Sequence, residues 1–72
     1  MRSTGLGNRL KEERARLGIT QAELAAMVGV SRKTVVTVEN RIFIPSALLA
    51  LRLARALGTT VDRLFFEDDS GV

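Results

Sequence analysis

The sequence has no cysteine, no histidine, no tryptophan and no tyrosine among its 72 residues. Without cysteine there are no disulfides, so folding must rest on side-chain packing, and a reducing cytoplasm is the expected compartment. Without histidine or cysteine, the commonest nucleophiles, general bases and transition-metal ligands are missing together. We therefore expect a protein that is not an enzyme and that uses no metal or cofactor.

Long hydrophobic runs are also absent from the sequence. Arg52 and Arg55 interrupt the most apolar region, so no stretch reaches the roughly 18 residues of a membrane span. The N-terminus lacks the apolar run of a secretory signal. A chain this short holds one domain at most, which we expect at 6–66, between a flexible arm at 1–5 and a short acidic tail at 67–72.

The charged residues are unevenly distributed. Residues 1–66 contain 11 basic and 5 acidic side chains, a net charge of +6, whereas the last six residues carry −3. Nine of the basic residues are arginine, whose rigid fork suits phosphate oxygens and guanine edges. A basic, arginine-rich body indicates an anionic partner, with an ordinary solvated surface as the alternative.

Hydrophobic spacing, capping residues and glycine stops predict five short helices and no strand. Thr20 and Glu23 form a capping-box pattern, and Ser31 is the natural N-cap of the next helix. The predicted helices cover 6–17, 21–28, 32–40, 47–57 and 61–66. The expected fold class is therefore all-α, as a compact five-helix bundle.

The second and third predicted helices, joined by a turn at Gly29, have the spacing of a helix-turn-helix over 20–40. At about 100° per residue, Val35 and Val38 face inward. The opposite arc of the third helix carries Arg32, Lys33, Val36, Thr37 and Asn40. A helix fits the major groove of DNA with its N-terminal turn at the base edges. This arc therefore indicates duplex reading, although a solvated polar face explains either cation alone.

These segments resemble the XRE-type helix-turn-helix family, which includes phage repressor and Cro proteins. The matching motifs are Thr20-Gln21-Ala22-Glu23-Leu24-Ala25, Val28-Gly29-Val30-Ser31-Arg32-Lys33-Thr34-Val35 and Val38-Glu39-Asn40, continued by Pro45-Ser46 and Leu57-Gly58. The likeness covers about residues 6–66. It implies a repressor/Cro-like fold and a sequence-specific regulator, most simply a repressor, that binds a palindromic operator in double-stranded DNA as a homodimer.

The resemblance also implies roles for single residues. Base edges would be met by Arg32, Lys33 and Thr37, with Val36 near a thymine methyl. Phosphates would be met by Gln21, Ser31, Thr34 and Asn40, and the Gln21 side chain would brace Arg32.

In this family a basic residue at the Arg14 position pairs with an acid at the Glu39 position. We expect Arg14 and Glu39 to form a partly buried structural pair that sets the angle of the third helix. A phosphate contact from Arg14 is the secondary interpretation.

The sequence departs from the family pattern just after the third helix. Arg41 replaces the usual glycine, and a left-handed conformation there costs about 1 kcal/mol or more unless Asn40 adopts it instead. Arg41 could also add a phosphate or minor-groove contact. The neighbouring Phe43 is expected to pack inward, as this position usually does in the family.

Several apolar residues fall where polar residues are common or on the outer arc of the fourth helix. Together, Ile44, Leu48, Leu51 and Phe66 are expected to form an exposed patch, and such patches usually mark contacts. We take this patch as the candidate dimer surface, with the last helix, the Leu48 region or both making the contact.

Other functions stay open at this point. A controller protein or the DNA-binding component of an antitoxin system would carry the same motifs. A helical protein-interaction module without DNA binding would use the basic surface for an acidic protein. Arg2 either serves as a minor-groove arm or is simply disordered.

Overall fold

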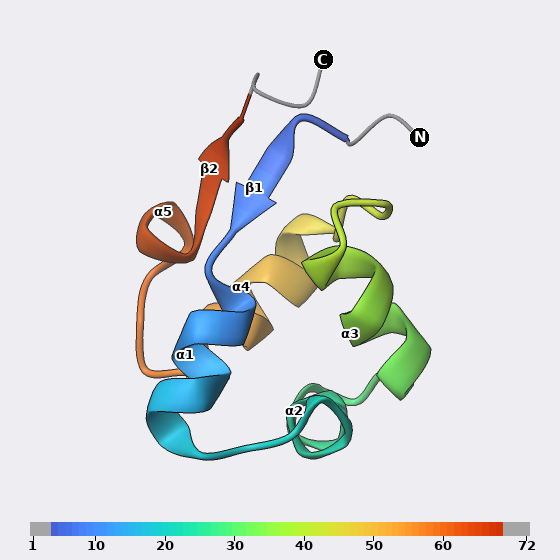
Figure 1. The fold of residues 1–72 in the computed structure, drawn as a ribbon, viewed down its shortest axis with the longest axis vertical. Helices are drawn as coiled ribbons and strands as arrows, with labels where there is room; N and C mark the ends of the chain where they lie inside the picture. The colour runs from blue at the N-terminus through green and yellow to red at the C-terminus, as the bar shows by residue number, and fades with distance from the viewer. Residues whose placement is uncertain (1–3, 69–72) are drawn as a thin grey trace.

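The computed structural model describes residues 4–68, which form five helices and two short strands. In chain order these are β1 (Leu6–Asn8), α1 (Leu10–Leu17), α2 (Gln21–Val28), α3 (Arg32–Glu39), α4 (Ala47–Ala56), α5 (Val61–Leu64) and β2 (Phe65–Glu67). The helices surround one core, and the two strands lie side by side at one end of it (Figure 1). The predicted five-helix bundle is therefore confirmed. None of the helices in this range is long and apolar enough to cross a membrane.

The N-terminal caps form where the sequence places them. In α2 the Glu23 amide donates to the Thr20 hydroxyl over 3.0 Å, and the Thr20 amide donates to the Glu23 carboxylate over 2.9 Å. Ser31 and Ser46 accept from the backbone in the same way at the starts of α3 and α4. These bonds satisfy amides that a helix N-terminus otherwise leaves without partners.

The start of α5 is different. Thr60 is its N-cap residue but makes no side-chain bond to the backbone of the helix. The Thr60 side chain instead hydrogen bonds Asp62, and this bond, with the Asp62 backbone N–H and the nearby Arg63, lowers the pKa of the Asp62 carboxyl below its usual value. Asp62 is therefore charged where the helix dipole favours an anion.

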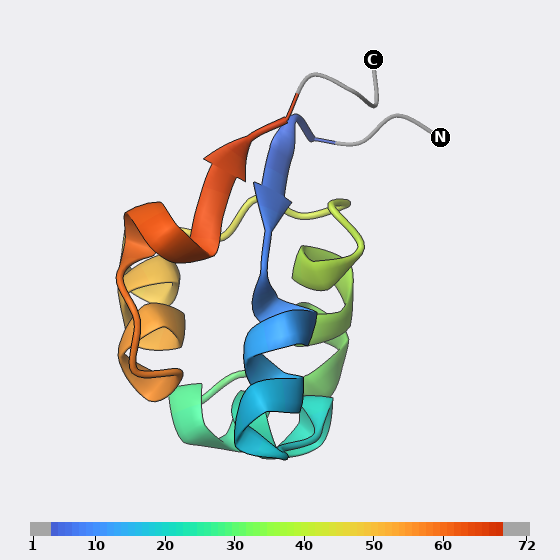
Figure 2. The ribbon, with the colours of Figure 1, turned by 60° about the vertical axis from the view of Figure 1, so that its left-hand side comes forward.

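The core is built from one face of each helix. The most deeply buried large side chains are Leu10, Leu24, Val35, Val38, Leu53, Leu57 and Leu64. Figure 2 shows α3 and α4 on opposite sides of the molecule, and α2 packs against both. Full burial of a valine or leucine contributes roughly 1.5–3 kcal/mol before conformational entropy is subtracted, so these faces account for the fold.

The two strands are a correction to the expected architecture. Leu6 lies in β1 and not in a first helix, and the last helix ends at Leu64 because Phe65–Glu67 forms β2. The strands pair antiparallel, with Gly7 opposite Phe66. The expected tail is also ordered at its start, because the Asp68 amide donates to the Gly5 carbonyl over 2.8 Å. Segments of three residues are too short to show a period-two pattern.

Phe66 is a second correction. Its ring lies half-buried across Gly7, with the Arg9 guanidinium 4.5 Å and the Arg41 guanidinium 5.9 Å from the ring centroid. The expectation that Phe66 joins an exposed apolar patch is therefore wrong. Because residue 7 has no Cβ, the ring can lie directly on the backbone of β1.

The loop between α3 and α4 turns most of its apolar side chains toward solvent. The amides of Ile42 and Phe43 both donate to the Thr37 carbonyl, over 2.9 and 3.2 Å, so the loop backbone folds onto the last turn of α3. Phe43 is 46% exposed, and the expectation that it packs inward is wrong. The buried residue of this loop is Pro45.

The contact between β1 and β2 gives a first prediction. A Cβ at residue 7 would lie 2.3–2.9 Å from three carbons of the Phe66 ring. We expect Gly7→Ala to lower the free energy of unfolding by about 1–3 kcal/mol in urea denaturation, because the ring must move. In a Phe66→Ala background the same change should have little effect, and an equal loss in both backgrounds would contradict this explanation.

Candidate nucleic-acid interface

The turn between α2 and α3 fixes how the two helices meet. Gly29 ends α2 in the left-handed conformation, with φ of 76°, and the Val30 amide donates to the Ala25 carbonyl over 3.0 Å. Only Val30 and Ser31 then separate the two helices. The helix-turn-helix expected at 20–40 is present, with α3 as its second helix.

The two faces of α3 have the polarity expected from the sequence. Val35 and Val38 are 1% and 2% exposed and belong to the core. On the outer face, Arg32, Lys33 and Asn40 are exposed, and Val36 and Thr37 are half-buried. The first turn of α3 contains no acidic residue, so two cations face solvent at the positive end of the helix dipole.

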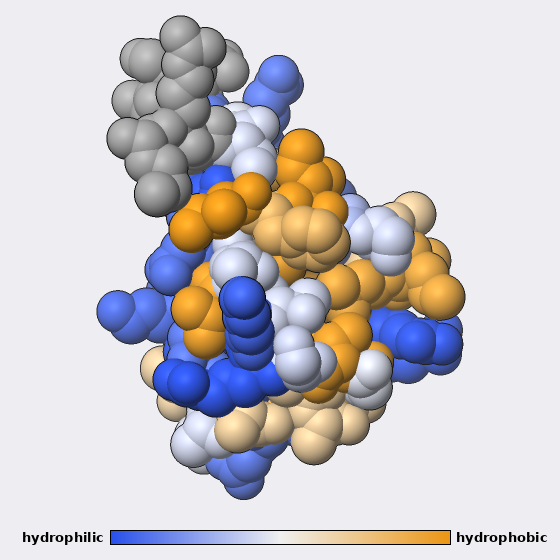
Figure 3. All heavy atoms as spheres, turned by 90° about the vertical axis from the view of Figure 1, so that its right-hand side faces the viewer, coloured by the Kyte–Doolittle hydropathy of each residue, from blue (hydrophilic) through white to orange (hydrophobic). Residues whose placement is uncertain are grey.

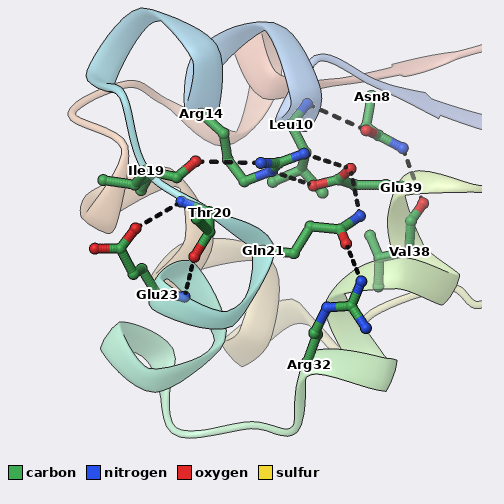
Figure 4. Close-up of polar contacts among 10 residues, drawn as sticks. All are labelled: Asn8, Leu10, Arg14, Ile19, Thr20, Gln21, Glu23, Arg32, Val38 and Glu39. Atoms are coloured by element: carbon green, nitrogen blue, oxygen red, sulfur yellow. Dashed lines mark hydrogen bonds and ion pairs between the residues drawn. The ribbon is translucent and has the colours of Figure 1, made fainter.

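An ion pair ties α3 to α1 (Figure 4). The Arg14 guanidinium donates to both oxygens of the Glu39 carboxylate, over 2.7 and 3.2 Å, and a further N–H reaches the Ile19 carbonyl at 3.1 Å. The side chains of Arg14 and Glu39 are only 15% and 7% exposed. The expected structural pair is therefore present, and its bidentate geometry fixes orientation as well as distance.

The same carboxylate also positions the start of α3. The Gln21 side-chain amide donates to Glu39 over 3.2 Å, and its oxygen accepts from the Arg32 guanidinium over 3.2 Å (Figure 4). The expected brace between Gln21 and Arg32 is present. The link from Gln21 to Glu39 is not apparent from sequence patterns, because it joins residues 18 positions apart. A continuous chain therefore runs from Arg14 through Glu39 and Gln21 to Arg32.

The start of α2 borders an open hollow of about 630 Å³. Its lining includes Arg14, Thr20, Gln21 and Arg32. The hollow thus combines a helix N-terminus, a side-chain amide and the Arg32 guanidinium, which all attract anions. The Arg14 guanidinium, which also lines it, is already paired with Glu39. Gln21 gives one of its two amide hydrogens to Glu39 and keeps the other for an outside acceptor.

Three hydroxyl groups on α3 and its N-cap already make hydrogen bonds within this segment. The Ser31 and Thr34 hydroxyls lie 3.1 Å apart and share a hydrogen bond, while the Thr37 hydroxyl donates to the Thr34 carbonyl over 2.9 Å. Because the Thr37 hydrogen is used, this side chain offers acceptor lone pairs in the observed rotamer. It therefore suits the amino group of cytosine or adenine.

Asn8 is a positioning residue that sequence reasoning missed. Its side-chain nitrogen donates to the Val38 carbonyl over 2.9 Å, and its side-chain oxygen accepts from the Leu10 amide over 3.1 Å. One side chain thus caps the start of α1 and the end of α3. An asparagine two residues before a helix is a weak capping signal, but its contact with Val38 depends on the tertiary fold.

Arg41 adopts the left-handed conformation itself, with φ of 62°, while the φ of Asn40 is −83°. The steric cost therefore falls on Arg41. Its guanidinium hydrogen bonds the Asp68 carboxylate, so the cation expected to meet a phosphate has a partner within the protein. Arg2, the candidate minor-groove arm, lies outside the described residues.

The remaining members of the expected apolar patch are exposed. Ile44, Leu48 and Leu51 are 58%, 56% and 57% exposed, and Ile42 and Phe43 lie beside Ile44 in the chain with similar exposure. We call these five residues the α3–α4 patch. Figure 3, which views the molecule from the side of α3, shows strongly hydrophobic residues across the upper and middle parts of this face, beside hydrophilic side chains.

Comparison with known proteins assigns the family. The sequence profile of the helix-turn-helix family matches residues 10–64. A transcriptional regulator of the HTH type from Methanothermobacter thermautotrophicus is 44% identical over 63 residues, which cover 86% of this chain and 91% of that protein. Another from Bacillus subtilis is 39% identical over 62 residues, 86% of this chain and 94% of that protein.

A solved structure gives the same result. The DNA-binding domain of the P22 c2 repressor superposes with a TM-score of 0.72 at 35% identity, covering 75% of this chain and 71% of that domain. The chain belongs to the XRE-type helix-turn-helix family, and the resemblance found in its motifs is confirmed.

The ion pair gives a second prediction. Glu39→Gln should lower the free energy of unfolding by about 1–3 kcal/mol, because it leaves the Arg14 guanidinium partly buried without its carboxylate. The control is Glu13→Gln, which breaks the exposed pair between Glu13 and Arg16 and should lose less than about 1 kcal/mol. The free energy of unfolding is measured by thermal and urea denaturation. If Glu39→Gln and Glu13→Gln lower it equally, Arg14 and Glu39 act as an ordinary surface pair.

Proposed function

We propose that this protein is a sequence-specific regulator of transcription that binds double-stranded DNA and inserts α3 into the major groove. The observation that carries the proposal is the first turn of α3, where Arg32 and Lys33 are exposed and Arg32 is held by Gln21. A braced guanidinium loses less conformational freedom on binding than a free one. The simplest regulatory outcome is repression by blocking access to a promoter.

In the proposed complex, specificity comes from the outer face of α3. Arg32 and Lys33 would meet acceptors on guanine edges, and Val36 would touch a thymine methyl. Thr37 would accept from an amino group, because its hydrogen is committed within the helix. This distribution places the strongest discrimination at the first turn of α3, where the side chains reach deepest into the groove.

Affinity in the proposed complex comes largely from phosphates. A backbone phosphate would occupy the hollow at the start of α2, where it accepts from the free Gln21 hydrogen. Further phosphate contacts would come from Ser31, Thr34, Asn40 and Arg41. Two similarities support this function: the relatives are transcriptional regulators of the HTH type, and the P22 c2 domain is a DNA-binding domain.

The proposed working unit is a two-fold dimer. The α3–α4 patch exposes five large apolar side chains, more than a scatter of single surface residues, and it follows directly on the end of α3. A dimer formed through this patch would contain two copies of α3, the proposed recognition helix. Helices about 34 Å apart read half-sites one turn apart, so the expected operator is a palindrome.

The interface gives a third prediction, measured on duplexes first selected from a random pool. Arg32→Ala should weaken binding to the selected site by about 1–3 kcal/mol and relax the preference at particular base pairs. Gln21→Ala should weaken all duplexes, because it removes a phosphate contact that carries no sequence information, and should weaken the selected site somewhat more, because Arg32 also loses its brace.

The matched control is Arg63→Ala, which removes the same charge from the exposed surface of α5. The role given to Arg32 is wrong if the two variants weaken binding equally and neither of them changes the base preference. A protein that shows no difference between selected and scrambled duplexes over a salt titration would overturn DNA reading and favour a protein-interaction module.

A fourth prediction concerns the dimer. Leu48→Asp should convert a dimer at micromolar concentration into a monomer in light scattering, because a buried unpaired carboxylate opposes association. Met27→Asp is the control, since Met27 is 55% exposed on α2, outside the patch, and it should leave the mass unchanged. A wild-type protein that stays monomeric throughout this range contradicts a preformed dimer.

A further inference from the structure

Arg41 stands between α3 and the paired strands at the chain ends. Its guanidinium hydrogen bonds the Asp68 carboxylate and lies over the Phe66 ring, with 5.9 Å to the centroid. Arg41 immediately follows Asn40, the C-cap of α3. The positive charge of Arg41, just after the end of α3, is therefore neutralised by the carboxylate of Asp68, which follows β2.

The backbone holds both partners of this pair. The Arg41 amide donates to the Val38 carbonyl over 3.0 Å, and its carbonyl accepts from the Thr4 amide over 2.9 Å. The Asp68 amide donates to the Gly5 carbonyl over 2.8 Å. Since Thr4 and Gly5 are adjacent, one short segment before β1 positions both ends of the ion pair.

The pair is more open than the structural pair in the centre of the interface. The Arg41 and Asp68 side chains are 36% and 14% exposed, whereas those of Arg14 and Glu39 are 15% and 7% exposed. Water reaches the Arg41 end of the pair, which weakens its ion pair with Asp68 relative to a fully buried pair. The Arg41 guanidinium is thus available for exchange with another oxyanion at small cost.

We propose that Asp68 competes with DNA phosphate for the Arg41 guanidinium and thereby sets the DNA affinity of the protein. This inference rests on the proposed function and deepens it, because it concerns the regulation of the same binding surface. A carboxylate and a phosphate offer the same charge-assisted oxygens to the same donors. On the duplex, the Arg41 guanidinium is shared between the Asp68 carboxylate and a phosphate. Asp68 therefore lowers both the affinity for DNA and the average number of phosphates that the protein neutralises.

The test measures binding to a mixed-sequence duplex of about three helical turns over a salt series, because a phosphate contact needs no particular sequence. Asp68→Asn should tighten binding about two- to five-fold, the range expected for losing a competing surface ion pair. The slope of log K against log salt should steepen by up to about 0.9 per protomer.

The matched control is Glu67→Gln, which makes the same change in net charge at an exposed neighbour on β2. It should alter affinity and slope less than Asp68→Asn. In an Arg41→Gln background, the effect of Asp68→Asn should fall to that of Glu67→Gln, because the cation in competition is gone.

Three results would overturn the inference. Asp68→Asn and Glu67→Gln could change binding equally, or Asp68→Asn could keep its full effect in the Arg41→Gln background; either outcome assigns the effect to general electrostatics. Weaker binding or loss of folding in Asp68→Asn would make Asp68 a structural support. If the wild-type protein binds no duplex at all, the proposed function itself fails, which is a distinct outcome.

Discussion

The ion pair between Arg14 and Glu39 is the contact on which the candidate interface depends. It fixes α3 against α1, and its carboxylate also holds Gln21, which in turn holds Arg32. Orientation is therefore passed from the interior to the surface by hydrogen bonds of defined geometry. In such a connected network each member restricts the rotamers available to the next.

Local physical chemistry explains why much of the fold was predictable. The capping box of Thr20 and Glu23 and the N-cap at Ser31 act within three residues, so their signals are complete in the sequence. The inward faces of α3 and α4 follow from helical periodicity alone. The resemblance added the pairs Arg14–Glu39 and Gln21–Arg32, which periodicity does not contain.

What the sequence could not predict depends on contacts between distant residues. The three-residue strands carry no periodic pattern, and their pairing requires both chain ends to meet. Phe66 looks like an exposed aromatic until Gly7 is placed beneath it. Phe43 departs from the usual family position because the loop backbone bonds to Thr37 and directs the ring outward. Each failure concerns a residue whose surroundings are set by tertiary structure.

The pairing of β1 with β2 has a consequence for folding during synthesis. Leu6 is aligned with Glu67, so the ribbon closes a loop that contains all five helices. Asn8 and Arg41 link that ribbon to the end of α3. A nascent chain can form α1 to α4 by local contacts, but the ribbon must wait until residue 67 has left the ribosome. The C-terminal side of α3 therefore gains these contacts only after the segments of α1 to α4 have been made.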